Sequence, residues 1–465
     1  MRRGIGKLLI LLVLLTSSEG HALQTINFGD TLVLQGTLSN DLQNEGTLIA
    51  QNGVAQPVIT GSLANNALTR ISTYDGSGGF FEVFGLNVNG GIQNAGTIRL
   101  ETGGTFGNSG AFNNLTVGLG TTLTNLPGGL IETTPHVGNG LSGNQINGDI
   151  LNQGTLDHDA FTTLVFRNSA GDLVGADQVN AGIINLNTAG ADFRDFNSFS
   201  NSGTIQGRSI VLYGLSNGIQ PGDFSTITNS GLVDMTAGNL TTLNQDTFTN
   251  TPTGQITLTG GTGALAHFNS WVNQGGVTIG AGQAYGLNGG IFAGIAENQP
   301  GGVIGGAGSL NIVAGTTFTN NGTIAPGSSF GDLTVLGSVL QGTNGILDLE
   351  IGGTDPGVTH DRLVMDTGIM TLGGILRLSF MDGFAPTTGQ EFDLIPGTVA
   401  DAFDSVEILG LEPGFLYDLD TSSGLTLTAL SDGVFVPEPS TALLLTSGLA
   451  ALAIGRRRIS PRGTL

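Results

Sequence analysis

The sequence predicts an all-β protein folded as a right-handed parallel β-helix (β-solenoid), with a short N-terminal signal helix and a C-terminal transmembrane helix. Three observations lead to this prediction. Gly makes up 79 of the 465 residues, and no long stretch between the termini has apolar residues at helical spacing. A motif containing Asn and Gly recurs along the chain, mostly at intervals of 21 to 31 residues. Each terminus combines a short apolar run with basic residues.

Residues 1–22 have the order of a secretory signal peptide. The basic segment MRRGIGK precedes the apolar run LLILLVLL, and small residues follow at Gly20 and Ala22. We therefore predict cleavage after Ala22 and export of the rest of the chain. A permanent anchor is the alternative, but eight apolar residues are too few for a hydrocarbon core that needs about 20. Cysteine is absent, which excludes disulfides and a lipid-anchored cysteine.

Residues 23–350 form the predicted solenoid body and carry the repeat. In eight copies Asn is followed two residues later by Gly and four residues later by Leu, Ile or Val, and three further copies contain a two-residue insertion with Pro. The Asn positions are Asn44, Asn94, Asn125, Asn152, Asn180, Asn201, Asn229, Asn250, Asn273, Asn298 and Asn320. The gap of 50 residues between Asn44 and Asn94 predicts one degenerate copy between them. A period of this length is typical of a solenoid.

Each coil of this length holds about three short strands, stacked about 4.8 Å above those of the preceding coil. We predict that the Asn side chains form an amide ladder and that Gly supplies a positive φ angle at the corner. A β-sandwich or propeller is the rival fold, but neither needs a constant corner at this period. The corner pairs are Asn44 and Gly46, Asn94 and Gly96, Asn152 and Gly154, Asn201 and Gly203, and Asn320 and Gly322.

The apolar residues that flank the corner are predicted to point inward and to line one continuous core. Those two positions before the Asn are Leu42, Ile92, Ile150, Phe199, Ile227, Phe248, Trp271 and Phe318. Those that follow the corner are Leu48, Ile98, Leu156, Ile205, Val233, Ile256, Val277 and Ile324.

Residues 316–384 resemble the last part of the β-helical passenger of bacterial autotransporters. The matching segments are GTIAPG (322–327), LDLEIGG (347–353), HDRLVMD (360–366) and LGGILRL (372–378). The resemblance implies a β-helix and a way of closing its end, and it implies no activity. We assign residues 351–431 to a C-terminal β region that closes the solenoid.

Residues 432–465 form a tail with three elements in a fixed order. VPEPS comprises Val436, Pro437, Glu438, Pro439 and Ser440; an uncharged run continues to residue 455; and Arg456, Arg457 and Arg458 follow. This order resembles the PEP-CTERM sorting signal of Gram-negative bacteria that make exopolysaccharide. The resemblance implies that an exosortase-type enzyme is a partner and that the apolar run halts transiently in the inner membrane, with the arginines on the cytoplasmic side. A plain membrane anchor is the alternative.

The net charge of the body limits the kinds of molecule that it can bind. Residues 23–436 contain seven basic and 34 acidic residues, a formal charge of −27. Nucleic acid is therefore excluded, since its binding depends on Lys and Arg. Cations and neutral glycans, including exopolysaccharide, are the easier partners. The histidines show no zinc-site spacing and the calcium-binding nonapeptide repeat is absent, so we expect neither a metal nor another cofactor, although calcium on loop aspartates is an alternative left open.

Three acidic clusters are the candidates for catalysis, because polysaccharide lyases and glycosidases need grouped carboxylates. The clusters are Asp192 with Arg194 and Asp195; Asp172 with Asp177; and Asp157 with His158 and Asp159. Each also has the pattern of solvated turn residues, and we expect no catalytic residue among them.

The sequence thus favours a non-enzymatic, structural or adhesive protein of the cell surface or extracellular matrix, associated with exopolysaccharide or biofilm. A polysaccharide-active enzyme on the same scaffold is the first alternative, and an ice-binding protein is the second. For the second, threonines occur in GTTLTN (120–125), LTTLNQ (240–245) and TTFTN (316–320), but the sequence predicts no regular Thr-x-Thr ladder.

Overall fold

The computed structural model describes residues 8–9, 23–50, 56–72, 83–101, 112–134, 143–159, 164–167, 176–187, 189–214, 225–243, 245–260, 263–266, 268–288 and 294–436. Both predicted terminal helices lie outside these residues, apart from a two-residue strand, β1 (Leu8–Leu9), that pairs with β3 (Thr31–Leu34). The described part of the chain contains strands and no helix.

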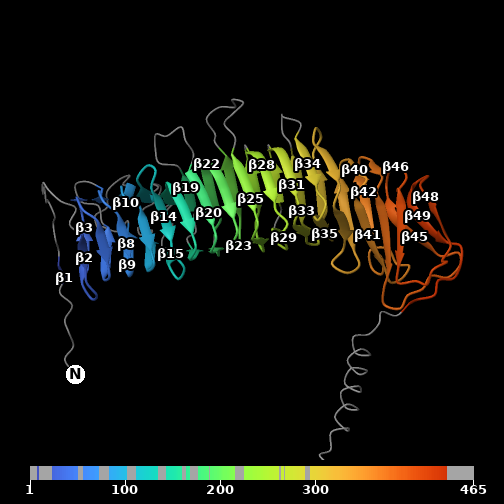
Figure 1. The fold of residues 1–465 in the computed structure, drawn as a ribbon, viewed down its shortest axis with the longest axis horizontal. Coiled ribbons are helices and arrows are strands. Elements are labelled where there is room, and N and C mark those ends of the chain that lie inside the picture. The colour runs from blue at the N-terminus through green and yellow to red at the C-terminus, as the bar shows by residue number, and fades with distance from the viewer. Residues whose placement is uncertain are drawn as a thin grey trace, which may run out of the picture.

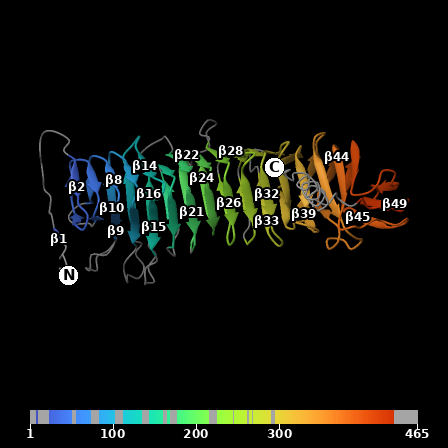
Figure 2. The same ribbon diagram turned by 60° about the horizontal axis from the view of Figure 1, so that its bottom comes forward.

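The strands stack in parallel along one axis and form an elongated rod (Figure 1). A typical coil has three strands. The first ends at the repeat Asn, the second follows the corner, and the third leads back to the next Asn; we call the three resulting surfaces the first, second and third faces. Figure 2 shows the same stack from another side. The prediction of a parallel β-helix is confirmed.

The first face comprises β2 (Gln24–Ile26), β5 (Leu42–Asn44), β8 (Leu63–Asn65), β11 (Ile92–Asn94), β14 (Thr122–Asn125), β17 (Asp149–Asn152), β20 (Ala176–Asn180), the C-terminal half of β22 (Ala191–Asn201), β25 (Thr226–Asn229), β28 (Gln245–Asn250), β31 (Phe268–Asn273), β34 (Ile295–Asn298), β37 (Thr317–Asn320), β40 (Val339–Gln341), β43 (Met370–Leu372) and β46 (Val399–Asp401).

The second face comprises β1, β3, β6 (Thr47–Ala50), β9 (Leu68–Ser72), β12 (Thr97–Glu101), β15 (Leu130–Thr134), β18 (Thr155–His158), β21 (Ile183–Leu186), β23 (Thr204–Gly207), β26 (Leu232–Met235), β29 (Gln255–Leu258), β32 (Gly276–Ile279), β35 (Val303–Gly306), β38 (Thr323–Pro326), β41 (Ile346–Ile351), β44 (Ile375–Phe380) and β47 (Ser405–Leu409).

The third face comprises β4 (Thr37–Leu38), β7 (Val58–Ile59), β10 (Val83–Val88), β13 (Phe112–Val117), β16 (Gly143–Asn147), β19 (Leu164–Arg167), the N-terminal half of β22, β24 (Ile210–Gly214), β27 (Leu240–Leu243), β30 (Gly263–Ala266), β33 (Ala284–Asn288), β36 (Ser309–Ile312), β39 (Asp332–Leu336) and β42 (Arg362–Thr367).

The C-terminal end of the rod is built differently. Parallel stacking continues on the second face as far as β47, and β45 (Glu391–Pro396) packs next to β42. β45 then pairs antiparallel with β49 (Gly424–Ala429), which also pairs antiparallel with β48 (Tyr417–Asp420). This small antiparallel sheet covers the edge of the last coil on that side (Figure 1).

The core runs the length of the rod. All sixteen residues predicted to point inward are buried, and the single tryptophan, Trp271, is fully buried with its indole N–H donating to the Tyr285 hydroxyl at 3.2 Å. Alternating burial along each short strand explains this arrangement, since successive side chains point to opposite sides of a strand. The predicted register is therefore confirmed.

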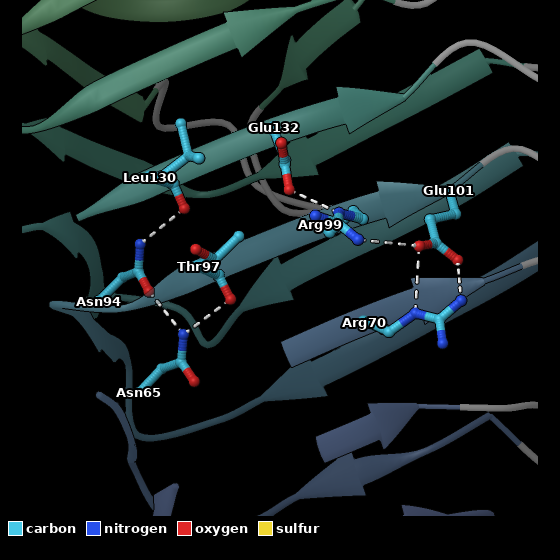
Figure 3. A network of polar contacts seen from close by, with 8 residues as sticks. All are labelled: Asn65, Arg70, Asn94, Thr97, Arg99, Glu101, Leu130 and Glu132. Atoms are coloured by element: carbon cyan, nitrogen blue, oxygen red, sulfur yellow. Dashed lines mark hydrogen bonds and ion pairs between the residues drawn. The ribbon is translucent and has the colours of Figure 1, made fainter. Parts of the chain in front are cut away.

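Inside the core, the repeat asparagines form a continuous amide ladder. Each Nδ2 donates to the Oδ1 of the next coil's Asn at 2.6–2.8 Å, from Asn44 to Asn320, where the series passes to Gln341 Oε1 at 2.9 Å. Most of these amides also donate to a backbone carbonyl of the next coil, as Asn94 does to Leu130 O at 3.1 Å (Figure 3). The ladder gives a hydrogen-bond partner to amide groups that are 0–2 % exposed.

The degenerate copy predicted between Asn44 and Asn94 is LANNALT, residues 63–69. Its amide is Asn65, which accepts from Asn44 and donates to Asn94. Ala67 stands where the other short copies have Gly, and Thr69 stands where they have Leu, Ile or Val, which is why the pattern missed this copy.

The predicted role of the corner glycines is wrong in its mechanism. Gly46, Gly96, Gly154, Gly203 and Gly322 all lie outside the positive-φ region; positive φ occurs instead at Gly128 and Gly301, in copies with the inserted Pro. A Cβ on any of the five would lie 2.0–2.4 Å from a backbone carbonyl oxygen of the preceding coil. Glycine is therefore favoured for close approach between coils, because at four of the five positions that carbonyl also accepts the N–H of the residue after the glycine.

Ion pairs link neighbouring coils on the second face near the N-terminal end. Arg70 on β9 pairs with Glu101 on β12, and Arg99 on β12 pairs with Glu132 on β15 (Figure 3). Arg99 also lies 3.7 Å from Glu101. The register of adjacent parallel strands brings these outward side chains together.

Gly203→Ala tests the close-approach mechanism. The new methyl would lie 2.0 Å from Gly182 O, which also accepts the Thr204 N–H at 2.8 Å and cannot easily move away. We expect a loss of about 1–3 kcal/mol in the free energy of unfolding, measured as a lower melting temperature and denaturation midpoint. Ser202→Ala, at the exposed neighbouring position, is the control and should leave both unchanged. An unaltered midpoint for Gly203→Ala would contradict the mechanism.

Candidate functional site

The C-terminal junction of the rod is fixed by the HDR segment, residues 360–362. His360 is buried and lies edge-on to Phe392, with ring centroids 5.7 Å apart. The carboxylate of Asp361, 1 % exposed, accepts the Gly331 and Glu350 N–H groups, both at 2.8 Å. Arg362 pairs with Asp332 at 2.6 Å and with Asp393 at 3.5 Å. These contacts join the last parallel coils to the antiparallel sheet.

The pKa values of this junction are shifted by burial. Burial raises the pKa of Asp361 to about 7, although its two N–H partners favour the ionised form. Burial, together with Asp348 and Asp382, raises the pKa of Glu350. The pKa of His360 is lowered, mainly because burial disfavours its charged form. In the sequence, the HDR segment was noted only as part of the resemblance to autotransporter passengers, and nothing there predicted that Asp361 is buried.

The folded body ends directly beside the predicted sorting motif. The Val436 N–H donates to Gly410 O at 2.8 Å, the Glu412 N–H donates to Val434 O at 2.8 Å, and Phe435 forms an antiparallel bridge with Leu411. Val436 is the last described residue. Of the other predicted sorting and processing residues, Pro437, Glu438, Pro439, Ser440, Arg456, Arg457, Arg458 and Ala22 lie outside the described part of the chain.

Comparison with protein families decides the nature of this segment. The family model for the PEP-CTERM protein-sorting motif matches residues 435–458. The chain carries a PEP-CTERM sorting motif. It is therefore an exported protein, processed by an exosortase-type enzyme, with a membrane-anchored form at the cell surface. No curated protein matches the chain. Among the described residues there is no helix long and apolar enough to span a membrane.

The PEP-CTERM motif thus follows immediately on the folded rod. The match begins at Phe435, which bridges to Leu411, and its second residue, Val436, donates its N–H to Gly410 O, so the match starts against the β47–β48 connection. The remainder starts at a proline, which cannot donate a backbone hydrogen bond. Because the docked segment lies at the end of the rod opposite the first coil, the anchored protein has its N-terminal coil at the far end from the motif (Figure 1).

The acidic candidates lie on separate faces. Asp192 on β22 forms an ion pair with Arg194 at 2.6 Å, and the Arg194 guanidinium lies 5.1 Å from the centre of the Tyr213 ring, on the third face. Asp177, at the start of β20, accepts the Ser198 hydroxyl at 2.8 Å on the first face. Nothing is described of the Asp195 side chain or of Asp172.

Asp157 and His158 lie on the second face, on β18. The Asn185 amide donates to Asp157, whereas His158 is fully buried, with Nδ1 2.7 Å from the Thr133 hydroxyl. Alternation along the strand therefore points these neighbours in opposite directions. The described residues hold no group of three or more His, Asp or Glu side chains able to bind a metal ion.

The first face has two columns of outward hydroxyls that the sequence did not predict. They are in register over three successive strands, as Ser198 and Ser200, Thr226 and Thr228, and Thr247 and Thr249. Ser270 continues one column while Val272 interrupts the other. Only two successive strands carry Thr-x-Thr, so these short hydroxyl columns are not the regular Thr-x-Thr ladder that the sequence was expected to lack.

Asp361→Asn tests the buried acid through the pH dependence of stability. Since folding raises its pKa from 3.8 to about 7, the folded state holds a proton that the unfolded state releases. The associated stability is present in full below pH 4 and is lost as pH rises through 7. We expect the wild-type melting temperature to fall more steeply than that of Asp361→Asn between pH 5 and pH 8. Parallel curves for the two proteins would contradict the assignment.

Replacing Pro437, Glu438 and Pro439 together by alanine tests the sorting motif. We expect the first cut, after Ala22, to be unaffected and the second to be lost, so that the protein stays in the inner membrane of an exosortase-encoding host. Intact mass and cell fractionation measure both outcomes, and wild-type protein is the control. Released wild-type protein that still contains Leu443 to Arg458, or normal release of the variant, would show that the segment is only an anchor.

Proposed function

We propose that the protein is a non-catalytic, rigid, acidic rod that is delivered to the cell surface and then retained in, or released into, the exopolysaccharide matrix. The observation that carries the proposal is that the sorting motif starts where the folded rod ends, so the whole rod is the delivered cargo. A solenoid of this kind supplies a long, stiff surface without needing a catalytic cleft.

Charge supports neutral glycans as the partner. The body has a formal charge of −27, and five of its seven arginines, Arg70, Arg99, Arg194, Arg362 and Arg377, are engaged in ion pairs. Few cationic groups are therefore left to hold an acidic polysaccharide. Neutral sugars are recognised through hydroxyl and amide groups, which the outward positions of the first face provide.

The same contacts support a non-enzymatic role. The acid and base candidates lie on different faces, and the one arginine among them is paired with Asp192 and stacked near Tyr213. A glycosidase needs two carboxyl groups within about 10 Å, flanking one bond. The candidate acids Asp192, Asp177 and Asp157 lie on three different faces, which supports this part of the proposal.

Co-sedimentation with the polysaccharide isolated from the host matrix tests this function. We expect the released protein to pellet with the polysaccharide and to stay in the supernatant once the polysaccharide has been digested. The same mixture should yield no new reducing ends and no unsaturated uronate. Protein that remains in the supernatant throughout would contradict matrix binding, and turnover that Asp192→Ala abolishes would establish the enzyme instead.

The hydroxyl columns favour one second candidate, binding to an ordered surface such as ice. In-register strands place hydroxyls about 4.8 Å apart along the rod and about 7 Å apart across it. A thermal hysteresis assay tests this, with Thr228→Tyr to disrupt the first face and Thr241→Tyr on the third face as the matched control. Hysteresis that only Thr228→Tyr abolishes would support the candidate, and its absence from the wild-type protein would exclude it.

A further inference from the structure

The first coil leaves three strand edges at the N-terminal end of the rod. β2, β3 and β4 each pair with a strand of the next coil, on β5, β6 and β7. The inward bonds include Thr47 N–H to Asp30 O at 2.9 Å, Glu45 N–H to Ile26 O at 2.8 Å and Thr60 N–H to Leu38 O at 2.8 Å. Each strand therefore uses alternate residues for its own ladder.

In β2, β3 and β4 the intervening residues direct their backbone N–H and C=O groups along the rod axis, away from the second coil. In a parallel ladder the N–H and C=O groups of successive residues point to opposite sides, so those of Thr25, Val33 and Thr37 point outward at the end of the stack. Among the described residues, β1 is the strand that pairs there, through Leu8 with Thr31 and Leu9 with Leu32. β1 lies within the predicted signal peptide, and its removal would expose this edge.

Among the described residues, the strands at this end are short but lack the charged and proline residues that usually protect a strand edge. Residues 23–38 contain no Lys, Arg or Pro and a single acid, Asp30. Two large apolar side chains are exposed beside it, Phe28 at 94 % and Leu23 at 59 %. The opposite end differs, because residues 378–436 contain ten acidic and no basic residues, and β49 already pairs with β45.

We infer that, once the leader is removed, the N-terminal ends of two copies of this chain dock head to head and pair edge to edge. A two-fold arrangement brings Phe28 and Leu23 of both copies together and closes on itself. The head-to-head arrangement is favoured over a head-to-tail one because, at the C-terminal end, β45 already pairs with β49. After leader removal each copy has one acid, Asp30, and one α-amino group, on Leu23, at this end, so little net charge opposes the contact. The inference rests on export and on leader removal, and it is independent of the glycan-binding proposal.

Sedimentation velocity on the protein released by an exosortase-encoding host tests the inference, after intact mass has verified loss of residues 1–22. We expect twice the monomer mass at micromolar concentrations. Small-angle scattering should give a maximum dimension close to twice that of the monomer, as an end-to-end pair requires.

Val33→Pro is the decisive variant, because it removes one outward N–H while the bonds of β3 to β6 come from its neighbours. We expect it to halve the sedimenting mass while leaving the circular dichroism spectrum and melting temperature of the rod in place. Val33→Thr keeps the N–H and is the matched control that should remain a dimer.

Phe28→Asp provides a second variant that does not depend on the strand itself, since Phe28 is almost fully exposed. It should also give monomer. A monomeric wild-type protein at tens of micromolar, or dimers that persist in both Val33→Pro and Phe28→Asp, would overturn the inference, and open-ended filaments would show head-to-tail stacking instead.

Discussion

The amide ladder is the constraint on which the rest of the structure depends. A buried side-chain amide that lacks partners costs about 1–3 kcal/mol, and each repeat Asn after Asn44 accordingly lies between two other side-chain amides. That arrangement fixes the register of the coils from Asn44 to Gln341 at one point, and the glycine two residues later in most copies lets the coils approach closely enough for the amides to meet. Loop length can then vary between coils without disturbing the core.

Much of the fold could be predicted because this constraint is written into the sequence at short range. The Asn-x-Gly spacing located the corners, and the apolar neighbours gave the core with Trp271 buried as expected. Asn65 was missed since Ala67 and Thr69 both depart from the pattern, and its place in the ladder indicates that Gly is preferred but not obligatory at the corner. The conformation of the glycines could not be predicted, because a close contact with another coil and a positive φ angle both select glycine. Buried Asp361 was also missed, as its partners are backbone N–H groups of residues distant in sequence.

For the function, too, the features that lie in one short segment could be predicted from the sequence, and those that combine several coils could not. The sorting motif is contiguous, so sequence and family comparison agree on residues 435–458 and on export. The use of the rod depends on how separate coils combine, as in the hydroxyl columns of the first face and in the neutral edge of the first coil. The sorting motif follows one end of the rod and the first coil lies at the other (Figure 1).

The central claim is that stability is transmitted from coil to coil through the ladder, and hydrogen exchange measured by mass spectrometry on Asn201→Asp tests it most directly. The new carboxylate can accept from Asn180 but leaves Asn229 Oδ1 and Leu232 O without their donor. The account predicts faster exchange in β20 to β28 around the altered coil, with the first coil and residues 332–430 unchanged. Unaltered exchange around residue 201, or uniform acceleration along the whole rod, would contradict it.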